Sequence, residues 1–108
     1  MIIIYREHQM EKIDTKAAEQ FYSAVLKLRT MDECRSFFDD VCTIKELQDL
    51  VQRFQVALLL DEGKNYMEFS RQTSVSSATI SRVNRCLVYG DGGYRTVIKR
   101  MKDGGSDD

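Results

Sequence analysis

With 108 residues, 43% of them apolar and none of them proline, the chain suits one folded domain and is too apolar for a disordered protein. Three cysteines without a C-x-x-C pair, and a single histidine (His8), argue against a metal site and favour a reducing cytoplasm. The net charge of −1 conceals a split, because residues 64–102 hold eight Lys/Arg and two Asp/Glu, a net charge of +6 that suits phosphate.

Helical spacing without period-two alternation predicts an all-α protein. Residues 1–14 are expected to form a flexible extension, whose apolar start is too short to span a membrane. The main domain is expected over residues 15–102. Its first helix should begin after Asp14 or Thr15, which are good N-caps. The apolar face of that helix is expected to contain Ala18, Phe21, Val25 and Leu28.

Two capping boxes predict the next two helices. Thr30 and Glu33 open a short helix, and Thr43 and Glu46 open a long one over residues 44–61, since each Thr and Glu can satisfy free backbone amides. Past Phe54 the long helix is apolar on most sides, which indicates a central element buried by its own chain and by a partner.

Residues 66–85 carry the pattern of a helix-turn-helix. Asn65 begins the first helix, residues 73–75 form the turn, and the second helix should run from Ser76 to about Tyr89. Its buried positions are Ile80, Val83 and Leu87. A last helix over residues 94–101 adds Lys99, Arg100 and Lys102 for phosphate, and residues 103–108 are expected to be a disordered tail.

The outer face of the second helix is small and polar at first and becomes basic. A rotation of about 100° per residue places Ala78, Ser81, Arg82, Arg85 and Tyr89 on this side. Short side chains let a helix backbone approach base edges in the major groove, and arginines further along bind phosphates. An ordinary amphipathic helix with a solvated basic face is the alternative.

These residues carry a resemblance. The run CTIKELQDLVQRFQVALLLDEG, followed by SSATISRVNRCL, resembles the Trp repressor superfamily. With the stretch FFDDVCTIKEL it is most similar to the Trp-repressor-related proteins of the YerC/YecD type, over about residues 17–99. The resemblance implies a six-helix fold and an intertwined homodimer. It also implies that two helix-turn-helix motifs bind successive major grooves of a near-palindromic operator in double-stranded DNA.

By this resemblance, Ser77, Ala78, Thr79 and Ser81 occupy the tip of the recognition helix. Together with the basic stripe they complete the expected DNA-binding set, which is Tyr66, Arg71, Ser76, Ser77, Ala78, Thr79, Ser81, Arg82 and Arg85.

The resemblance further implies a possible effector pocket made of Arg53, Arg82, Val83 and Cys86. In the tryptophan-sensing member, two arginines hold the indole, a glycine leaves room for it and a serine helps to bind its amino group. Val83 and Cys86 stand here at the glycine and serine positions. Overpacking by a branched side chain typically costs ~1–3 kcal/mol, and a thiol is a weak hydrogen-bonding group, so L-tryptophan is not expected to bind.

The sequence therefore predicts a dimeric, sequence-specific DNA-binding transcriptional regulator, expected to be a repressor, with no cofactor. A helical protein-interaction module whose helix-turn-helix no longer reads DNA is the alternative. No enzyme is expected, because the chain lacks a Cys–His pairing and a glycine-rich phosphate loop that follows a strand.

Overall fold

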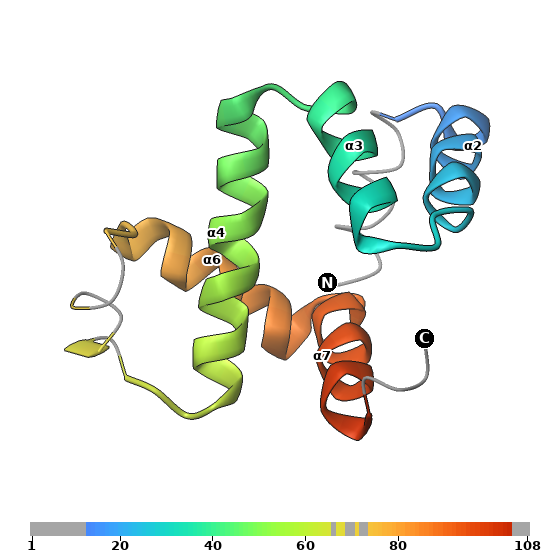
Figure 1. Ribbon diagram of the computed structural model, residues 1–108. Coiled ribbons are helices and arrows are strands. Elements are labelled where there is room, and N and C mark those ends of the chain that lie inside the picture. Colours follow the sequence, from blue (N-terminus) through green and yellow to red (C-terminus); the bar gives the residue numbers. More distant parts are fainter. Residues whose placement is uncertain (1–12, 66, 69–70, 72–73, 105–108) are drawn as a thin grey trace. The chain divides into compact units, whose positions relative to one another are not determined.

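The structure is a computed structural model that describes residues 13–65, 67–68, 71 and 74–104 (Figure 1). Five helices lie wholly within these residues, which contain no strand, so the all-α prediction is confirmed. The helices are α2 (Thr15–Val25), α3 (Met31–Val41), α4 (Ile44–Asp61), α6 (Ser77–Tyr89) and α7 (Gly93–Asp103). Met67, Glu68 and Arg71 are helical as well, but the rest of the predicted first motif helix lies outside the described residues.

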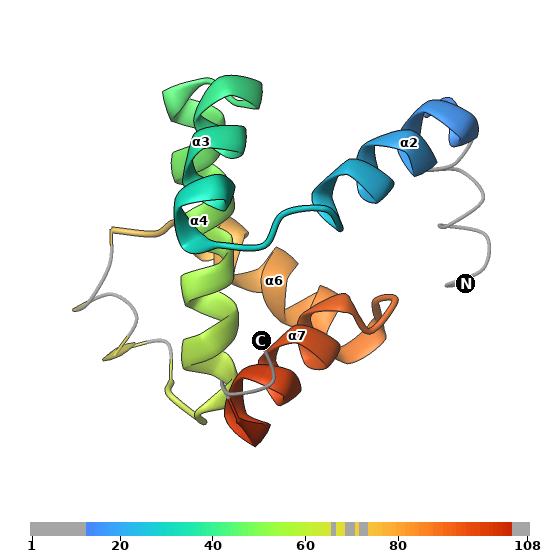
Figure 2. The same ribbon diagram turned by 45° about the vertical axis from the view of Figure 1, so that its right-hand side comes forward.

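The chain divides into two compact units, Met1–Leu47 and Gln48–Asp108. The first unit holds α2 and α3, joined by residues 26–30, and the start of α4 (Figure 2). The second unit holds the rest of α4 together with α6 and α7.

Helix α2 begins where the sequence predicts and ends earlier. Asp14 is the N-cap, and its carboxylate accepts a hydrogen bond of 3.1 Å from the amide of Ala17. The helix was expected to continue through Leu28, but Leu26 is its C-cap. The amide of Leu28 instead bonds to the carbonyl of Val25 at 3.1 Å, an i→i+3 contact that tightens the last turn and ends the helix.

Both predicted capping boxes form, in slightly different ways. At the start of α4, Thr43 Oγ1 accepts from the Glu46 amide at 3.1 Å and Glu46 Oε1 accepts from the Thr43 amide at 2.9 Å. At α3, Thr30 Oγ1 accepts from the Glu33 amide at 3.0 Å, but Glu33 Oε1 reaches the Arg29 amide at 2.7 Å instead of that of Thr30. Each box satisfies two backbone donors that the helix itself leaves free.

The first unit has little interior of its own. None of the residues of α2 and α3 is buried. The two helices meet where Phe21 stacks on Phe37, with ring centroids 5.9 Å apart. Large apolar side chains lie open to solvent, with Leu26 82% exposed and Ile44 78% exposed.

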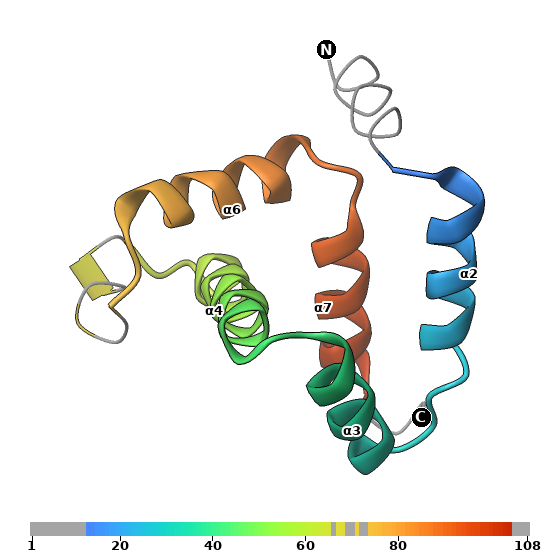
Figure 3. The same ribbon diagram turned by 90° about the horizontal axis from the view of Figure 1, so that it is seen from above.

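The second unit contains the hydrophobic core. Helix α6 crosses α4 at a steep angle, and the chain then turns into α7 (Figure 3). The predicted inward face of α6 is confirmed, because Ile80, Val83 and Leu87 are all buried. Past Phe54, Val56 and Ala57 of α4 are buried within the chain, while Leu58, Leu59 and Leu60 are half-buried. Burial of this helix by a partner stays a prediction. The core consists of Val56, Ala57, Val75, Ile80, Val83, Leu87 and Ile98.

The connection from α4 towards the motif begins at Gly63, as the sequence predicts. Its φ of +84° is one that side-chain-bearing residues rarely adopt. The amide of Gly63 bonds to the carbonyl of Leu60 at 3.0 Å and the amide of Lys64 to that of Leu59 at 3.1 Å, which is a Schellman C-cap. Asn65 and Glu68 then form another reciprocal capping box, with distances of 3.0 and 3.3 Å.

Helix α7 is longer at both ends than the predicted range of 94–101. It follows Gly92, whose φ of +88° turns the chain after α6. It continues to Asp103, whose carboxylate lies 2.6 Å from Lys99 Nζ, so the predicted tail overlaps the helix by one residue. In the part of the chain that the structure describes, no helix combines the length and apolar character needed to cross a bilayer.

Candidate nucleic-acid interface

The candidate interface starts at the N-terminus of α6, which Ser76 caps. Ser76 Oγ accepts from the Thr79 amide at 3.2 Å and donates to Thr79 Oγ1 at 3.1 Å. Two of the residues predicted to contact DNA therefore also fix the shape of the helix tip. No acidic residue stands in the first turn, so the partial positive charge of the helix N-terminus remains available to an anion.

Short side chains surround this tip. Ser77, Ala78 and Ser81 are exposed, and Thr79 is half-buried. The opposite face of the same helix is buried in the core, so the rotation predicted from the sequence is confirmed by the burial of Ile80 and Val83. The helix backbone can therefore approach a surface closely on its outer side only.

Three exposed arginines extend the interface. Arg82 and Arg85 follow on α6, and Arg71 precedes the turn. Among the described residues, none of the three takes part in an ion pair. Their charges are therefore available to phosphate groups. Tyr66, which was also predicted to contact DNA, lies outside the described residues.

The cations of α7 are less available than the sequence suggests. Lys99 pairs with Asp103 of its own helix, and Lys102 forms an ion pair with Asp61 at the end of α4. The bond to Asp61, followed by its negative charge, raises the pKa of the Lys102 ammonium. A lysine already neutralised by a carboxylate releases few phosphate counterions, so Lys99 and Lys102 are less available to phosphate than the exposed Arg100 of the same helix.

The four residues of the predicted effector pocket have different surroundings. Val83 is 1% exposed, Arg53 and Cys86 are half-buried, and Arg82 is exposed. Tyr94, which the sequence did not predict here, interacts electrostatically with three of these four residues. Burial raises the pKa of its phenol, and so does Cys86. The positive charges of Arg53 and Arg82 lower that pKa.

Tyr94 is also in contact with α4. Its ring stacks on Phe54 with the centroids 6.3 Å apart and an angle of 26° between the planes. The sequence contains a signal for this placement, because Tyr94 precedes the buried Ile98 by four residues and so shares its helix face.

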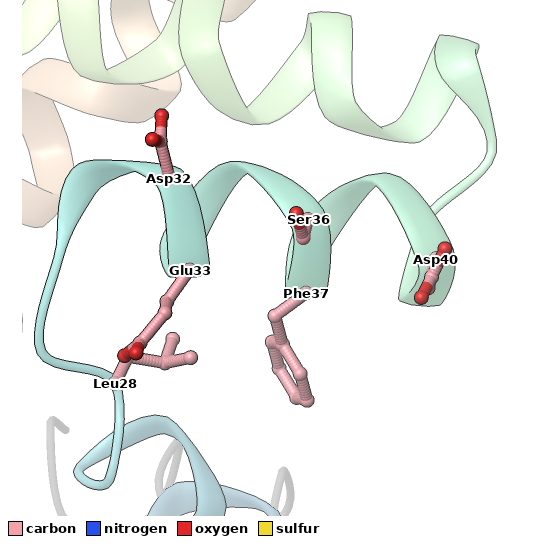
Figure 4. Close-up of a pocket in the computed structure, with 6 residues that line it drawn as sticks. All are labelled: Leu28, Asp32, Glu33, Ser36, Phe37 and Asp40. Atoms are coloured by element: carbon pink, nitrogen blue, oxygen red, sulfur yellow. The ribbon is translucent and has the colours of Figure 1, made fainter.

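The first unit contains an open hollow of ≈ 410 Å³ beside α3, lined by Leu28, Asp32, Glu33, Ser36, Phe37 and Asp40 (Figure 4). Figure 4 shows Glu33 and Phe37 directed to the side of Leu28, and Asp32 directed to the opposite side. Three of the six lining side chains are carboxylates, which repel phosphate, so the hollow is not part of the nucleic-acid interface.

A small helical core that presents one amphipathic helix with a polar, basic outer face is typical of helical DNA-binding regulators. The sequence model of the Trp repressor protein family matches residues 16–102 of this chain. The chain therefore belongs to the Trp repressor family.

Its relatives define the branch of that family. The chain is 44% identical over 95 residues to the protein YerC of Bacillus subtilis (strain 168), an alignment that covers 88% of this chain and 91% of YerC. Among solved structures, it is 40% identical to a Staphylococcus aureus protein of the Trp repressor type, with a TM-score of 0.81 over 87% of this chain and 94% of the other.

A TrpR-like protein of Eubacterium eligens ATCC 27750 is 48% identical, with a TM-score of 0.80 over 85% of this chain and 95% of the other. The protein is thus a Trp-repressor-related protein of the YerC type, as the resemblance in its sequence predicts.

Proposed function

We propose that the protein is a dimeric, sequence-specific DNA-binding transcriptional repressor of the cytoplasm, and that it does not respond to tryptophan. The observation that carries this proposal is the outer face of α6, where exposed Ser77, Ala78 and Ser81 precede arginines that no carboxylate in the described residues neutralises.

The mechanism follows from the size and charge of these side chains. Short residues at the helix tip admit the backbone into the major groove, where Ser77 and Ser81 can bond base edges directly or through water. Arg82 and Arg85 bind the flanking phosphates, which positions the helix without selecting a sequence. Operator choice would therefore depend on the tip and overall affinity on the arginines.

The dimer is supported by the first unit, which leaves its apolar side chains without cover. Exposed patches of this kind mark protein interfaces, and most soluble oligomers are symmetric dimers of one chain. A second copy would cover the apolar side chains of α2, α3 and the start of α4, and would present two copies of α6 about one helical turn of DNA, ~34 Å, apart. The exposed apolar residues concerned are Phe21, Tyr22, Leu26, Met31, Val41 and Ile44.

The proposal that tryptophan is not an effector is supported by the burial of Val83. That side chain is almost fully buried, and the ring of Tyr94 stands near the two arginines of the predicted pocket.

A dimer bound to a promoter would exclude polymerase sterically, which is the basis for proposing repression instead of activation.

Selection of bound duplexes from a random pool tests DNA binding and symmetry together. We expect enrichment of an inverted repeat whose half-sites lie about one helical turn apart. The purified protein should also elute from immobilised DNA as the salt concentration rises. A pool that stays random, with no salt-dependent retention on DNA, would favour the interaction-module alternative and refute the proposal.

A further inference from the structure

Tyr94 connects the three helices of the second unit. It stands in the first turn of α7, its ring stacks on Phe54 of α4, and its half-buried side chain packs against the core cluster that includes Val83 of α6. Its phenol lies in the electrostatic neighbourhood of Arg53 on α4 and of Arg82 and Cys86 on α6.

The site around the ring is suited to an aromatic group. Phe54 offers a flat apolar face on one side, and offset stacking at this separation is favourable for two aromatic rings. The positive charges of Arg53 and Arg82 act on the phenol and lower its pKa, so their field favours an oxygen-bearing substituent on a ring at this position. Burial raises the pKa of the phenol, so the ring stays uncharged further into the alkaline range than an exposed tyrosine does.

We propose that Tyr94 is a positioning residue that holds the recognition helix α6 on α4, acting as a built-in aromatic occupant of a site that would otherwise bind a small phenol. This inference rests on the proposed function, in which α6 is the recognition helix. It explains how α6 keeps its position without a ligand that could dissociate.

A clear consequence is that the site can be emptied and refilled. Replacing Tyr94 with alanine removes the ring while Arg53, Phe54, Arg82 and Cys86 remain. An apolar space left by a deleted ring can accept a ligand of similar shape. A small phenol should then restore what the truncation removes.

The test uses the full chain with Tyr94→Leu, Tyr94→Phe and Tyr94→Ala, and p-cresol as the probe. DNA affinity is measured on a selected duplex, and hydrogen exchange is measured at the amides of α6. Because an aromatic pair contributes ~0.5–1.5 kcal/mol, Tyr94→Leu should weaken DNA binding about two- to tenfold, whereas Tyr94→Phe should match the wild type. Thr96→Ala, an exposed change on the same helix, is the control and should change neither readout.

In Tyr94→Ala, millimolar p-cresol should lower the exchange rates of α6 towards wild-type values and raise DNA affinity, and it should do neither in the wild type. If Tyr94→Ala does not fold, a double-mutant cycle of Tyr94→Leu with Phe54→Leu replaces it. The double variant should then lose less affinity than the product of the two single losses.

Tyr94→Leu with wild-type affinity and wild-type exchange at α6 would overturn the inference, and so would p-cresol that leaves a folded Tyr94→Ala unchanged. The two proposals fail separately. A wild-type protein that binds no DNA would refute the proposed function, while the exchange of α6 amides would still report whether Tyr94 holds that helix.

Discussion

The guanidinium of Arg95 donates a hydrogen bond of 2.7 Å from Nε to the backbone carbonyl of Leu87. This carbonyl belongs to the last turn of α6, where the helix has no internal donor left for it. A cation at this end also opposes the partial negative charge of the helix dipole. Arg95 of helix α7 therefore caps α6 at its C-terminus, just as Ser76 caps it at its N-terminus.

The first prediction concerns this cap. Arg95→Ala should lower the free energy of unfolding by about 1 kcal/mol, less than the usual ~1.5–3 kcal/mol for a charged hydrogen bond because Arg95 is partly solvated. Urea unfolding followed by circular dichroism measures the loss. Arg100→Ala, an exposed change on the same helix, should stay within about 0.5 kcal/mol of the wild type. Equal effects of the two substitutions would mean that the bond to Leu87 contributes nothing.

The second prediction concerns the capping box of α4. Thr43→Ala removes the acceptor of the Glu46 amide and should cost about 1 kcal/mol of unfolding free energy. Thr43→Ser keeps the hydroxyl and should cost much less. Chemical denaturation of the two variants in parallel measures both unfolding free energies. A Thr43→Ser variant as unstable as Thr43→Ala would disprove a capping role.

The third prediction separates affinity from sequence reading. Arg82→Ala should weaken binding to a selected and to a scrambled duplex by the same factor. It should also reduce the slope of log K against log salt by about 1.8, because each dimer loses two phosphate contacts. Ala78→Leu puts a bulky side chain at the tip of α6 and should change the preference between duplexes. Fluorescence anisotropy at several salt concentrations measures these effects. Loss of the preference between duplexes in Arg82→Ala would show that this arginine reads bases.

The fourth prediction concerns alkaline pH. The pKa of Tyr94 is raised above 10.0 by burial, and the pKa of Lys102 is raised above 10.5 by its hydrogen bond to Asp61. For both groups the protonated form is favoured in the folded state, so their stabilisation is present in full below pH 10 and is lost as the pH rises through the folded-state values.

Unfolding free energy should therefore fall from about pH 10 upwards, and Tyr94→Phe should flatten part of that fall because phenylalanine does not titrate. Urea denaturation over a series of alkaline buffers gives the profile, with Tyr22→Phe as the matched control at an exposed tyrosine. Identical slopes for the two variants would contradict a contribution from Tyr94.

Local patterns in the sequence predict local structure well in this chain. The capping pair of Thr43 and Glu46 and the helix end at Gly63 depend on residues within a few positions of each other, and both form as predicted. The inward face of α6 follows from helical spacing alone, since burial alternates with the 3.6-residue period.

Features that depend on distant residues could not be predicted in this way. Tyr94 finds Phe54 forty positions earlier in the chain, and only the packing of α7 brings the rings together. The end of α2 at Leu26 could not be predicted either. The apolar spacing in the sequence continues to Leu28, but the backbone tightens there and ends the helix. Neither the stacking of these rings nor the end of α2 corresponds to a periodic pattern in the sequence.

Hydroxyl-radical footprinting of a selected duplex tests the central claim most directly, because it reports where each copy of α6 meets the DNA. Two protected windows on one face of the duplex, about one helical turn apart and both weakened to the same extent in Arg82→Ala, are the expected result. A single window, or protection that Arg82→Ala leaves unchanged, would contradict a dimer that binds DNA through this helix.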